Sequence, residues 1–442
     1  MRQRTQLVCV TAILAIAIFS GCSSKPSPAE VQETRLALER VLQAKQPPFP
    51  GDRGSRVREV WQDVHRFYKA NDEQLVWSDG RKPRGTFDAL LRALRAADVE
   101  GLAPADYHVD DLTAAHDNFD PEQAADLDVR GTYAYLRYAA DLAHGTVDPE
   151  DVMPQWHKAS KTVDLHQTLL SAIASNQVEQ SLVQLAPTAA QYQGLKHQLA
   201  GLRSNGGDPA AIEMIAMNME RWRWLPQDLG ARYIMVNTPA FQLDAIENGK
   251  SVLSMRVVTG KKENPTPVLV DEMTSIVFSP YWNIPPDIVE KEILPKLETD
   301  PTYLERNNME VDETGQRYRQ RPGKGNSLGQ VKFVFPNHFN VYLHGTPSQR
   351  LFNRVERDFS HGCVRLERPL DLAKYVLRDQ PEWTEERIVA AMDSGTEQSV
   401  KLKQPLPVYL VYFTAWEEQG TLKTVPDVYG IDRRHDKASE GP

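Results

Sequence analysis

Residues 341–366 read VYLHGTPSQRLFNRVERDFSHGCVRL, and this stretch decides how the C-terminal half of the chain is organised. Its first part is a β-type run that ends at His344 and breaks into a Gly-Thr-Pro turn. Its last part places Gly362 and Cys363 before a second short apolar run. A histidine at the end of a strand is well placed to face a cleft. Cys363 and His344 are therefore candidates for a nucleophile and its base.

Strand patterns surround this stretch on both sides. Three β-branched runs, 233–238, 241–246 and 251–259, are expected as strands. Asn248-Gly249 lies between the second run and the third, and this dipeptide is a strong hairpin signal. The expected strands are 233–238, 241–246, 251–259, 274–278, 331–335, 340–343 and 408–414. The expected helices between them are 287–297, 301–307, 369–378 and 384–393. These segments predict a mixed, β-dominated domain over residues 227–418.

The N-terminal half follows a helical pattern instead. Residues 29–45 suit an amphipathic helix, which the proline-rich residues 46–51 end. Helical segments continue to about residue 203, and a linker at 205–209 precedes a last helix that closes at Pro226. We predict a helical domain over 53–226. The charged residues 433–437 predict a disordered C-terminal tail within 419–442.

The first residues have the pattern of an export signal. Arg2 and Arg4 precede a neutral apolar run, 7–19, which is too short to span a membrane. The run ends at Cys22 in a pattern that resembles a bacterial lipobox. Residues 1–21 are then a signal peptide, and 22–52 a lipidated tether with a short helix. This predicts a lipoprotein on the periplasmic face of the outer membrane in a Gram-negative bacterium; the alternative is secretion with a free Cys22.

Composition narrows the classes of function. The chain has 442 residues, and about 150 residues per domain would give about three domains. The formal net charge of −9 argues against nucleic acid as a partner, because sequence-independent binding needs a basic surface. Of the three cysteines, Cys9 lies in the signal peptide and Cys22 is the expected lipid site. Cys363 is then a solitary thiol, which is either buried and inert or kept for its reactivity.

The neighbours of Cys363 favour reactivity. Positive charge on His361 or Arg365 lowers the pKa of a nearby thiol. Gly362 lets main-chain N–H groups approach a developing oxyanion. A thiol nucleophile also needs a base, which His344 supplies, unless His344 is an edge histidine bonded to backbone.

The spacing from His344 to Ser360-His361-Gly362-Cys363-Val364-Arg365 resembles the signature of the L,D-transpeptidase family. Further blocks resemble the large, scaffold-bearing branch of that family: 279–286, 291–296, 300–304, 322–329 and 332–333 in the catalytic part, and 73–77, 142–145 and 221–226 in the scaffold. Only about 25 residues follow 192–195 before the last scaffold block, so the peptidoglycan-binding module of larger relatives is missing. The resemblance implies an α+β fold, with a helical scaffold followed by a β-rich, sandwich-like catalytic domain that carries a lid at about 288–325.

The family resemblance also implies a chemistry. Cys363 would form a thioester with a peptidoglycan tetrapeptide stem, releasing the terminal D-alanine, and His344 would transfer the protons. The main-chain carbonyl of Gly345 would orient His344, while His361 and Gly362 would support the oxyanion. Arg365 would hold a stem carboxylate or brace the cysteine loop. Trp282, Asn283 and Tyr342 are either cleft-lining residues or parts of the core.

The implied product is a 3-3 cross-link between two stems, made without a cofactor and with other wall synthases as further partners. No metal site is expected, because no His or Cys lies at a zinc-like spacing from His361. The polar run 310–321 of the lid is expected to be mobile. Alternatives are an L,D-carboxypeptidase, an enzyme that attaches a protein or a D-amino acid to the wall, and a non-catalytic wall-binding scaffold. A papain-like peptidase does not fit, because there the cysteine precedes the histidine.

Overall fold

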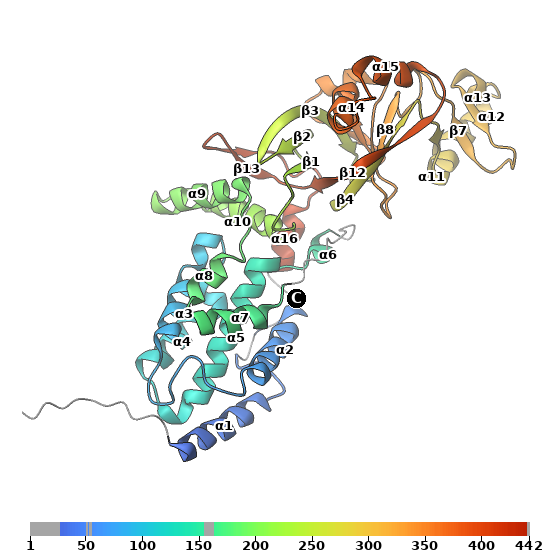
Figure 1. Ribbon diagram of the computed structural model, residues 1–442. Helices are drawn as coiled ribbons and strands as arrows, with labels where there is room; N and C mark the ends of the chain where they lie inside the picture. Colours follow the sequence, from blue (N-terminus) through green and yellow to red (C-terminus); the bar gives the residue numbers. More distant parts are fainter. Residues whose placement is uncertain (1–26, 50–51, 53–54, 154–162, 440–442) are drawn as a thin grey trace, which may run out of the picture.

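The computed structural model describes residues 27–49, 52, 55–153 and 163–439. Within these ranges no helix has the length and apolar character needed to cross a membrane. The predicted signal peptide and Cys22 lie outside the described residues. Figure 1 shows helices in the N-terminal half and a β-rich C-terminal half, which confirms the predicted α+β fold class.

The helical half is built around one long, almost fully buried helix, α5 (Ala124–His144). The first helix, α1 (Pro28–Leu42), begins with a capping box between Ser27 and Glu30, close to the predicted start. The other helices are α2 (Ser55–Ala70), α3 (Gly85–Arg95), α4 (Val109–Asp117), α6 (Pro149–Val152), α7 (Leu165–Ser175), α8 (Val178–Val183), α9 (Ala190–Ser204) and α10 (Pro209–Arg223), with 3-10 turns η1 (Ala97–Glu100), η2 (Pro104–Tyr107) and η3 (Pro121–Gln123). Helices α9 and α10 occupy the segment where a binding module would be inserted.

Buried polar groups explain two of the sequence blocks in this half. The Asp128 carboxylate on α5 accepts hydrogen bonds from the backbone N–H groups of Val76 and Trp77. The Glu220 carboxylate on α10 accepts from the N–H of Val147 at 3.0 Å and pairs with Arg223 at 3.0 Å. Each carboxylate therefore holds a loop against a helix.

The β-rich half contains one nine-stranded sheet with the strand order β10-β3-β11-β9-β8-β4-β12-β1-β2. Because β2 also pairs with β3, the sheet closes on itself. The strands are β1 (Arg232–Asn237), β2 (Gln242–Glu247), β3 (Lys250–Gly260), β4 (Leu269–Phe278), β8 (Val331–Val334), β9 (Leu343–His344), β10 (Asp358–Ser360), β11 (Val364–Leu366) and β12 (Gln398–Val411). The enclosed core also takes side chains from α14 (Pro369–Leu377) and α15 (Glu385–Asp393). A short turn, η5 (Gln349–Asn353), lies between β9 and β10.

The predicted hairpin at Asn248-Gly249 is confirmed, with positive φ angles of 47° and 76° that match a type I′ turn. Three strands differ from the prediction. Strand β4 begins at Leu269, five residues before residue 274. Strand β12 begins ten residues before residue 408, because its ladder continues across an irregularity between Lys401 and Leu406. Pro405 and Pro407 obscure this continuity in the sequence. Strand β9 is shorter than 340–343 predicts and ends on His344.

A small subdomain projects from the sheet between β4 and β8. It has its own cluster of buried side chains, Ile284, Ile288 and Ile293. Its elements are β5 (Trp282–Asn283), α11 (Pro286–Ile288), the π-helical turn η4 (Val289–Ile293), α12 (Leu294–Thr299), α13 (Tyr303–Arg306), β6 (Met309–Val311) and β7 (Tyr318–Gln320). This is the predicted lid. Its polar run is a hairpin of β6 and β7 instead of the expected mobile segment, because Glu310 pairs with Arg319 and Arg321 across the strands.

The C-terminal segment is structured, so the prediction of a disordered tail was wrong. It forms a hairpin of β13 (Ala415–Glu418) and β14 (Thr421–Thr424), and a helix, α16 (Asp432–Ser439). Asp432 pairs with the buried Arg221 of α10 at 2.6 Å, and His435 is buried. Helix α16 lies beside the scaffold helices (Figure 1). Contacts with residues about 200 positions earlier thus order a segment whose own composition is strongly polar.

The two halves share one apolar core. Side chains on the outer face of the sheet, such as Tyr233 and Tyr409, belong to the same cluster as the scaffold helices. Trp222 of α10 stacks on Phe413 with ring centroids 4.7 Å apart. The burial of this shared surface is the main force that holds the scaffold to the sheet.

Candidate active site

Three adjacent strands bring the candidate residues together. In the register of β8, β9 and β11, Lys332 lies opposite His344, and His344 lies opposite Arg365. Residues paired across neighbouring strands share one face of a sheet, so these three side chains form a row. Tyr342 is two residues before His344 on the same face, and Cys363 immediately precedes β11. The sheet therefore gathers a thiol, an imidazole, a phenol and two cations.

His344 is 4% exposed, and its Nδ1 lies 2.6 Å from the carbonyl oxygen of Gly345. This is the contact that the family resemblance implies. Burial lowers the pKa of His344 to about 3, and the positive charges of Arg365 and Lys332 act in the same direction. Backbone hydrogen bonds of the ring to Gly345 and Leu328 oppose this lowering of the pKa. When the Nδ1–H donates to Gly345, the other ring nitrogen carries the lone pair. His344 is therefore a neutral base at ordinary pH.

A glycine on the neighbouring segment allows the chain to pass close to His344. Gly329 has a φ of 63°, and a Cβ at this position would lie 2.6–2.9 Å from backbone atoms of Gly345 and Thr346. Only glycine fits both the conformation and the contact.

The Cys363 thiol is half-buried, and burial raises its pKa. Hydrogen bonds from Tyr342 and the charges of Lys332 and Arg365 oppose this effect by favouring the thiolate. The Sγ atom lies 3.8 Å from the carbonyl oxygen of Asn340. Among the described contacts the thiol has no hydrogen bond to His344; such bonds often tighten only when a substrate is present. The resting pair is thus a thiol and a neutral imidazole.

Ser360 fixes the turn that presents Cys363. Its hydroxyl accepts a hydrogen bond from the Gly362 N–H at 3.1 Å and donates to the Cys363 carbonyl at 2.5 Å. Gly362 has a φ of 110°, which favours glycine. Because its N–H is already bonded, the structure does not match the expectation that Gly362 supplies this group to an oxyanion. The Cys363 N–H forms no hydrogen bond within the described part of the chain. At this turn it is therefore the N–H group that can donate to an oxyanion.

The lid contacts the signature loop through a pair of polar side chains. Nε2 of the exposed His361 lies 2.9 Å from Oε1 of Glu292, which is on the π-helical turn η4. His361 therefore joins the cysteine loop to the lid, a contact that the sequence does not predict. Its support of an oxyanion stays a prediction.

The remaining predicted residues lie on different parts of the domain. Trp282 packs against the apolar cluster of the lid, and Asn283 is exposed on the same short strand. Neither is bonded to Cys363 or His344 among the described residues, so their role in substrate binding stays a prediction. Arg365 and Tyr342 do lie beside the thiol.

Sequence reasoning missed Lys332 as a site residue, although its block contributed to the family resemblance. It also missed Tyr429 on the C-terminal segment. The Tyr429 hydroxyl donates to the Gly260 carbonyl at 2.6 Å, and the Gly260 N–H donates to Thr266. The Thr266 hydroxyl in turn donates to the Gly362 carbonyl at 2.8 Å. A chain of hydrogen bonds thus connects the C-terminal segment to the cysteine loop.

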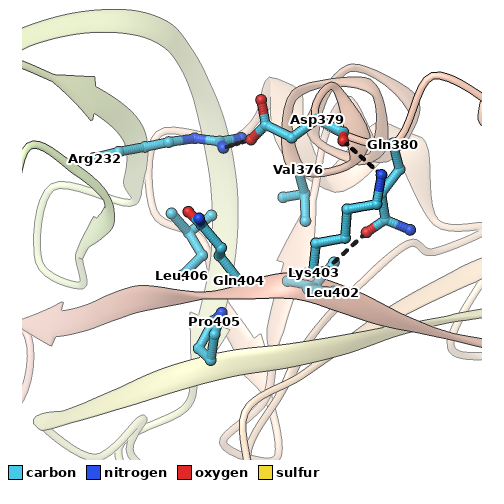
Figure 2. Close-up of a pocket in the computed structure, with 9 residues that line it drawn as sticks. All are labelled: Arg232, Val376, Asp379, Gln380, Leu402, Lys403, Gln404, Pro405 and Leu406. Carbon is cyan, nitrogen blue, oxygen red and sulfur yellow. Dashed lines mark hydrogen bonds and ion pairs between the residues drawn. The ribbon is translucent and has the colours of Figure 1, made fainter.

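A cavity of about 480 Å³ lies elsewhere, at the irregularity of β12, and contains none of the candidate residues. Figure 2 shows Arg232 pointing toward Asp379. The Nη1 atom of Arg232 lies 2.5 Å from Oδ2 of Asp379. The positive charge of Arg232 is thus neutralised by a carboxylate of the protein itself. Within the described residues, no group of three or more His, Cys, Asp or Glu side chains could hold a metal ion.

The sequence matches two family models, and neither covers the whole chain. Residues 62–199 match the Scaffold domain, and residues 231–398 match the L,D-transpeptidase catalytic domain. The second range contains His344, Cys363 and the lid. The end of α9 and the whole of α10 lie in the interval between the two ranges.

A relative from Haemophilus influenzae, whose own assignment as an L,D-transpeptidase is provisional, is 32% identical over 286 residues. The match covers 61% of this chain and 58% of the relative, so the chain spans less than two thirds of that protein's length.

Two solved structures are also similar to this chain. The L,D-transpeptidase from Mycobacterium smegmatis is 14% identical over 41% of this chain and 58% of its own, with a TM-score of 0.24. L,D-transpeptidase 1 from Mycobacterium tuberculosis is 13% identical over 41% and 61%, with a TM-score of 0.20. The two family models match parts of both halves of the fold. The chain is therefore similar to a Scaffold domain over residues 62–199 and to an L,D-transpeptidase catalytic domain over residues 231–398.

Proposed function

We propose that this protein is a cysteine L,D-transpeptidase that forms 3-3 cross-links between peptidoglycan tetrapeptide stems through a thioester on Cys363. One observation carries the proposal. Cys363 lies at the end of a strand row that contains His344, a neutral imidazole whose Nδ1 is held by the Gly345 carbonyl. A thiol and an oriented, neutral imidazole carried by adjoining strands are suited to nucleophilic acyl transfer.

In the first half-reaction, the Cys363 sulfur attacks the carbonyl carbon of the third residue of the donor stem. His344 takes the thiol proton as the C–S bond forms, and the carbonyl oxygen becomes an oxyanion. The tetrahedral intermediate then expels D-alanine, whose amine receives the proton from His344. The product is a thioester on Cys363.

In the second half-reaction, a side-chain amine of another stem attacks the thioester carbonyl. His344 accepts the amine proton and returns it to the sulfur as the C–S bond breaks. The new amide is the cross-link, and the free thiol is restored. Water in place of the amine would give an L,D-carboxypeptidase, and an amine from a protein or a D-amino acid would give an attachment reaction.

The Cys363 N–H would donate a hydrogen bond to the oxyanion, because it has no acceptor among the described residues. Removing one donor of this kind commonly costs about 2.7–4 kcal/mol of transition-state stabilisation. We assign His361 a supporting role, because its ring belongs to the same loop and pairs with Glu292 of the lid. Trp282 and Asn283 are assigned to substrate contact, since the lid that carries them is joined to the cysteine loop by that pair.

Product analysis tests the reaction. Purified protein is incubated with disaccharide-tetrapeptides, and the products are weighed by mass spectrometry. Cross-linked dimers with loss of one D-alanine support the proposal. Tripeptide products alone would replace it with a carboxypeptidase, and a mass increase on an added protein or D-amino acid would replace it with an attachment enzyme.

Carbapenem labelling tests whether the domain is catalytic at all. A carbapenem carries a strained amide that an active thiol opens, so one molecule should become attached to Cys363. If the intact mass stays unchanged while Cys363 is reduced, the protein is a wall-binding scaffold with an inert thiol.

We also propose that Cys22 is lipidated and holds the protein on the periplasmic face of the outer membrane, where peptidoglycan stems and other wall synthases are available. An acyl chain contributes about 0.8 kcal/mol for each buried methylene group. The mass of the N-terminal peptide from cells tests this. Lipid on Cys22, and release of a Cys22→Ala variant from the membrane fraction, support the anchor; a free Cys22 thiol contradicts it.

A further inference from the structure

The site contains a cation that no carboxylate neutralises. The Lys332 ammonium lies 4.1 Å from the centre of the Tyr342 ring and is partly buried. Within the described residues it forms no ion pair. The carboxylate whose charge acts on it, that of Glu397, accepts a hydrogen bond from the Tyr281 N–H at 2.7 Å and is not within ion-pair distance. A partly buried cation without an anion is disfavoured unless a ligand provides the anion.

A second cation at the site, that of Arg365, also lacks a neutralising carboxylate within the described residues. Arg365 lies on the other side of His344 in the strand row. Its Nε atom is buried and has no hydrogen-bond partner, and no carboxylate in the described part of the chain pairs with its guanidinium. The row therefore places one unneutralised cation on each side of the catalytic imidazole.

Two arginines that stack on tyrosine elsewhere in this domain show a contrast. The lid residue Lys296, over Tyr303, also forms no ion pair within the described residues, but it is exposed to solvent. Arg232 lies 4.6 Å from the Tyr375 ring centre. Its guanidinium also pairs with Asp379, and Figure 2 shows this pair. Arg319 lies over Tyr281 and pairs with Glu310 at 2.5 Å. Stacking on an aromatic ring is thus combined with a carboxylate at these two positions. At Lys332 the carboxylate is missing from the protein itself.

We propose that Lys332, together with Arg365, binds the free carboxylate of the terminal residue of the acyl donor, so that the enzyme selects anionic stems. This inference rests on the proposed function. The leaving residue is attached directly to the scissile carbonyl, and one residue spans at most about 3.6 Å. Its carboxylate therefore stays close to the strand row in which Lys332 and Arg365 flank His344. Lys332 is a specificity residue in this view, and its ammonium contacts the part of the substrate that departs.

A different role for Lys332 would be to stabilise the Cys363 thiolate. The two roles predict different results with donors that lack a carboxylate. A carboxylate-binding lysine matters only for acidic donors and acts mainly on KM. A thiolate-stabilising lysine matters for every donor and acts on the acylation rate constant.

Acylation of Cys363 is measured with a tetrapeptide donor that ends in a free carboxylate and with the same donor ending in a carboxamide. We expect kcat/KM to be about tenfold to a hundredfold higher for the acid, because a hydrogen bond to a charged group contributes that much. In Lys332→Met the acid-to-amide ratio should collapse toward 1 through a higher KM for the acid. Lys332→Arg should retain most of the ratio. Lys403→Met removes the same charge at the remote cavity and should leave the ratio unchanged.

Two results would overturn the inference and leave the proposed function intact. One is equal kcat/KM for the two donors in the unmodified protein, which needs no variant and hence no assumption about folding. The other is a Lys332→Met variant that slows both donors equally. If the unmodified protein is acylated by neither donor, both the inference and the proposed function fail.

Discussion

A buried carboxylate of the scaffold is paired with a charge of the opposite sign, whereas the two cations near the nucleophile form no ion pair within the described residues. In the scaffold, Glu220 accepts backbone hydrogen bonds and pairs with the fully buried Arg223. At the nucleophile, Lys332 and Arg365 have no carboxylate among the described residues. Removing one member of a buried pair exposes the other to an apolar interior, whereas an unpaired cation at a site leaves room for an anion. The difference indicates which charges maintain the fold and which are available to a substrate.

The largest expected effect is at the thiol. Cys363→Ala should abolish acylation, because the sulfur that forms the thioester is gone. Its midpoint of urea unfolding should remain close to that of the unmodified protein, because only a half-buried thiol is lost. Intact-mass spectrometry and urea titration measure the two properties. Acylation that persists in this variant would remove Cys363 from the mechanism.

A scaffold substitution should have the opposite profile. Arg223→Met leaves Glu220 buried without its cation and should lower the free energy of unfolding by about 3–5 kcal/mol. Below the unfolding transition the remaining folded protein should still acylate Cys363. The matched control is Arg92→Met, which breaks an exposed pair with Glu179 and should cost no more than about 1 kcal/mol. Equal losses in the two variants would contradict the comparison.

The pH dependence of acylation tests the electrostatics of the site. An ordinary histidine, with a pKa near 6.5, would lose the base form about tenfold per pH unit below that value. Because the pKa of His344 is lowered to about 3, the ring stays neutral well below pH 6.5. The pKa of the thiol is raised, so Cys363 stays protonated over the same range. Carbapenem acylation rates should therefore change little between pH 5 and 7, and a tenfold loss per unit would show that the imidazole is not held neutral.

The smallest expected effect is at the C-terminal segment. Tyr429→Phe removes the hydroxyl that donates to the Gly260 carbonyl. Gly260 is connected to the cysteine loop by two further hydrogen bonds, through Thr266. A lost hydrogen bond of this kind costs about 1 kcal/mol, so acylation should slow by about fivefold. Tyr135→Phe removes a similar bond, to Ser181 in the scaffold, and should leave the rate unchanged. The same rate in both variants would mean that the C-terminal segment does not position the loop.

The sequence predicted the parts of the site that follow from local patterns. His344 ends a strand and Cys363 lies on a glycine turn, so both are visible within a few residues of chain. Lys332 was not recognised, because its place beside His344 depends on the register between two strands. That register is set by the whole sheet and cannot be read from residues 332–333 alone.

The fold shows the same division between local and distant information. The hairpin at Asn248-Gly249 needs only its own two residues. Helix α16 needs Arg221, about 200 residues earlier, to pair with Asp432. The oxyanion role expected for the Gly362 N–H depended on the Ser360 hydroxyl, whose direction the sequence does not specify.

The most direct test of the account is to trap the acyl-enzyme and locate it. The protein is mixed with an acidic tetrapeptide donor in the absence of an acceptor, quenched in acid, digested and sequenced by mass spectrometry. The account predicts that the peptide containing Cys363 gains the mass of the donor minus D-alanine, and that His344→Ala gains it far more slowly. Acylation at another residue, or an unmodified Cys363 while D-alanine is released, would contradict it.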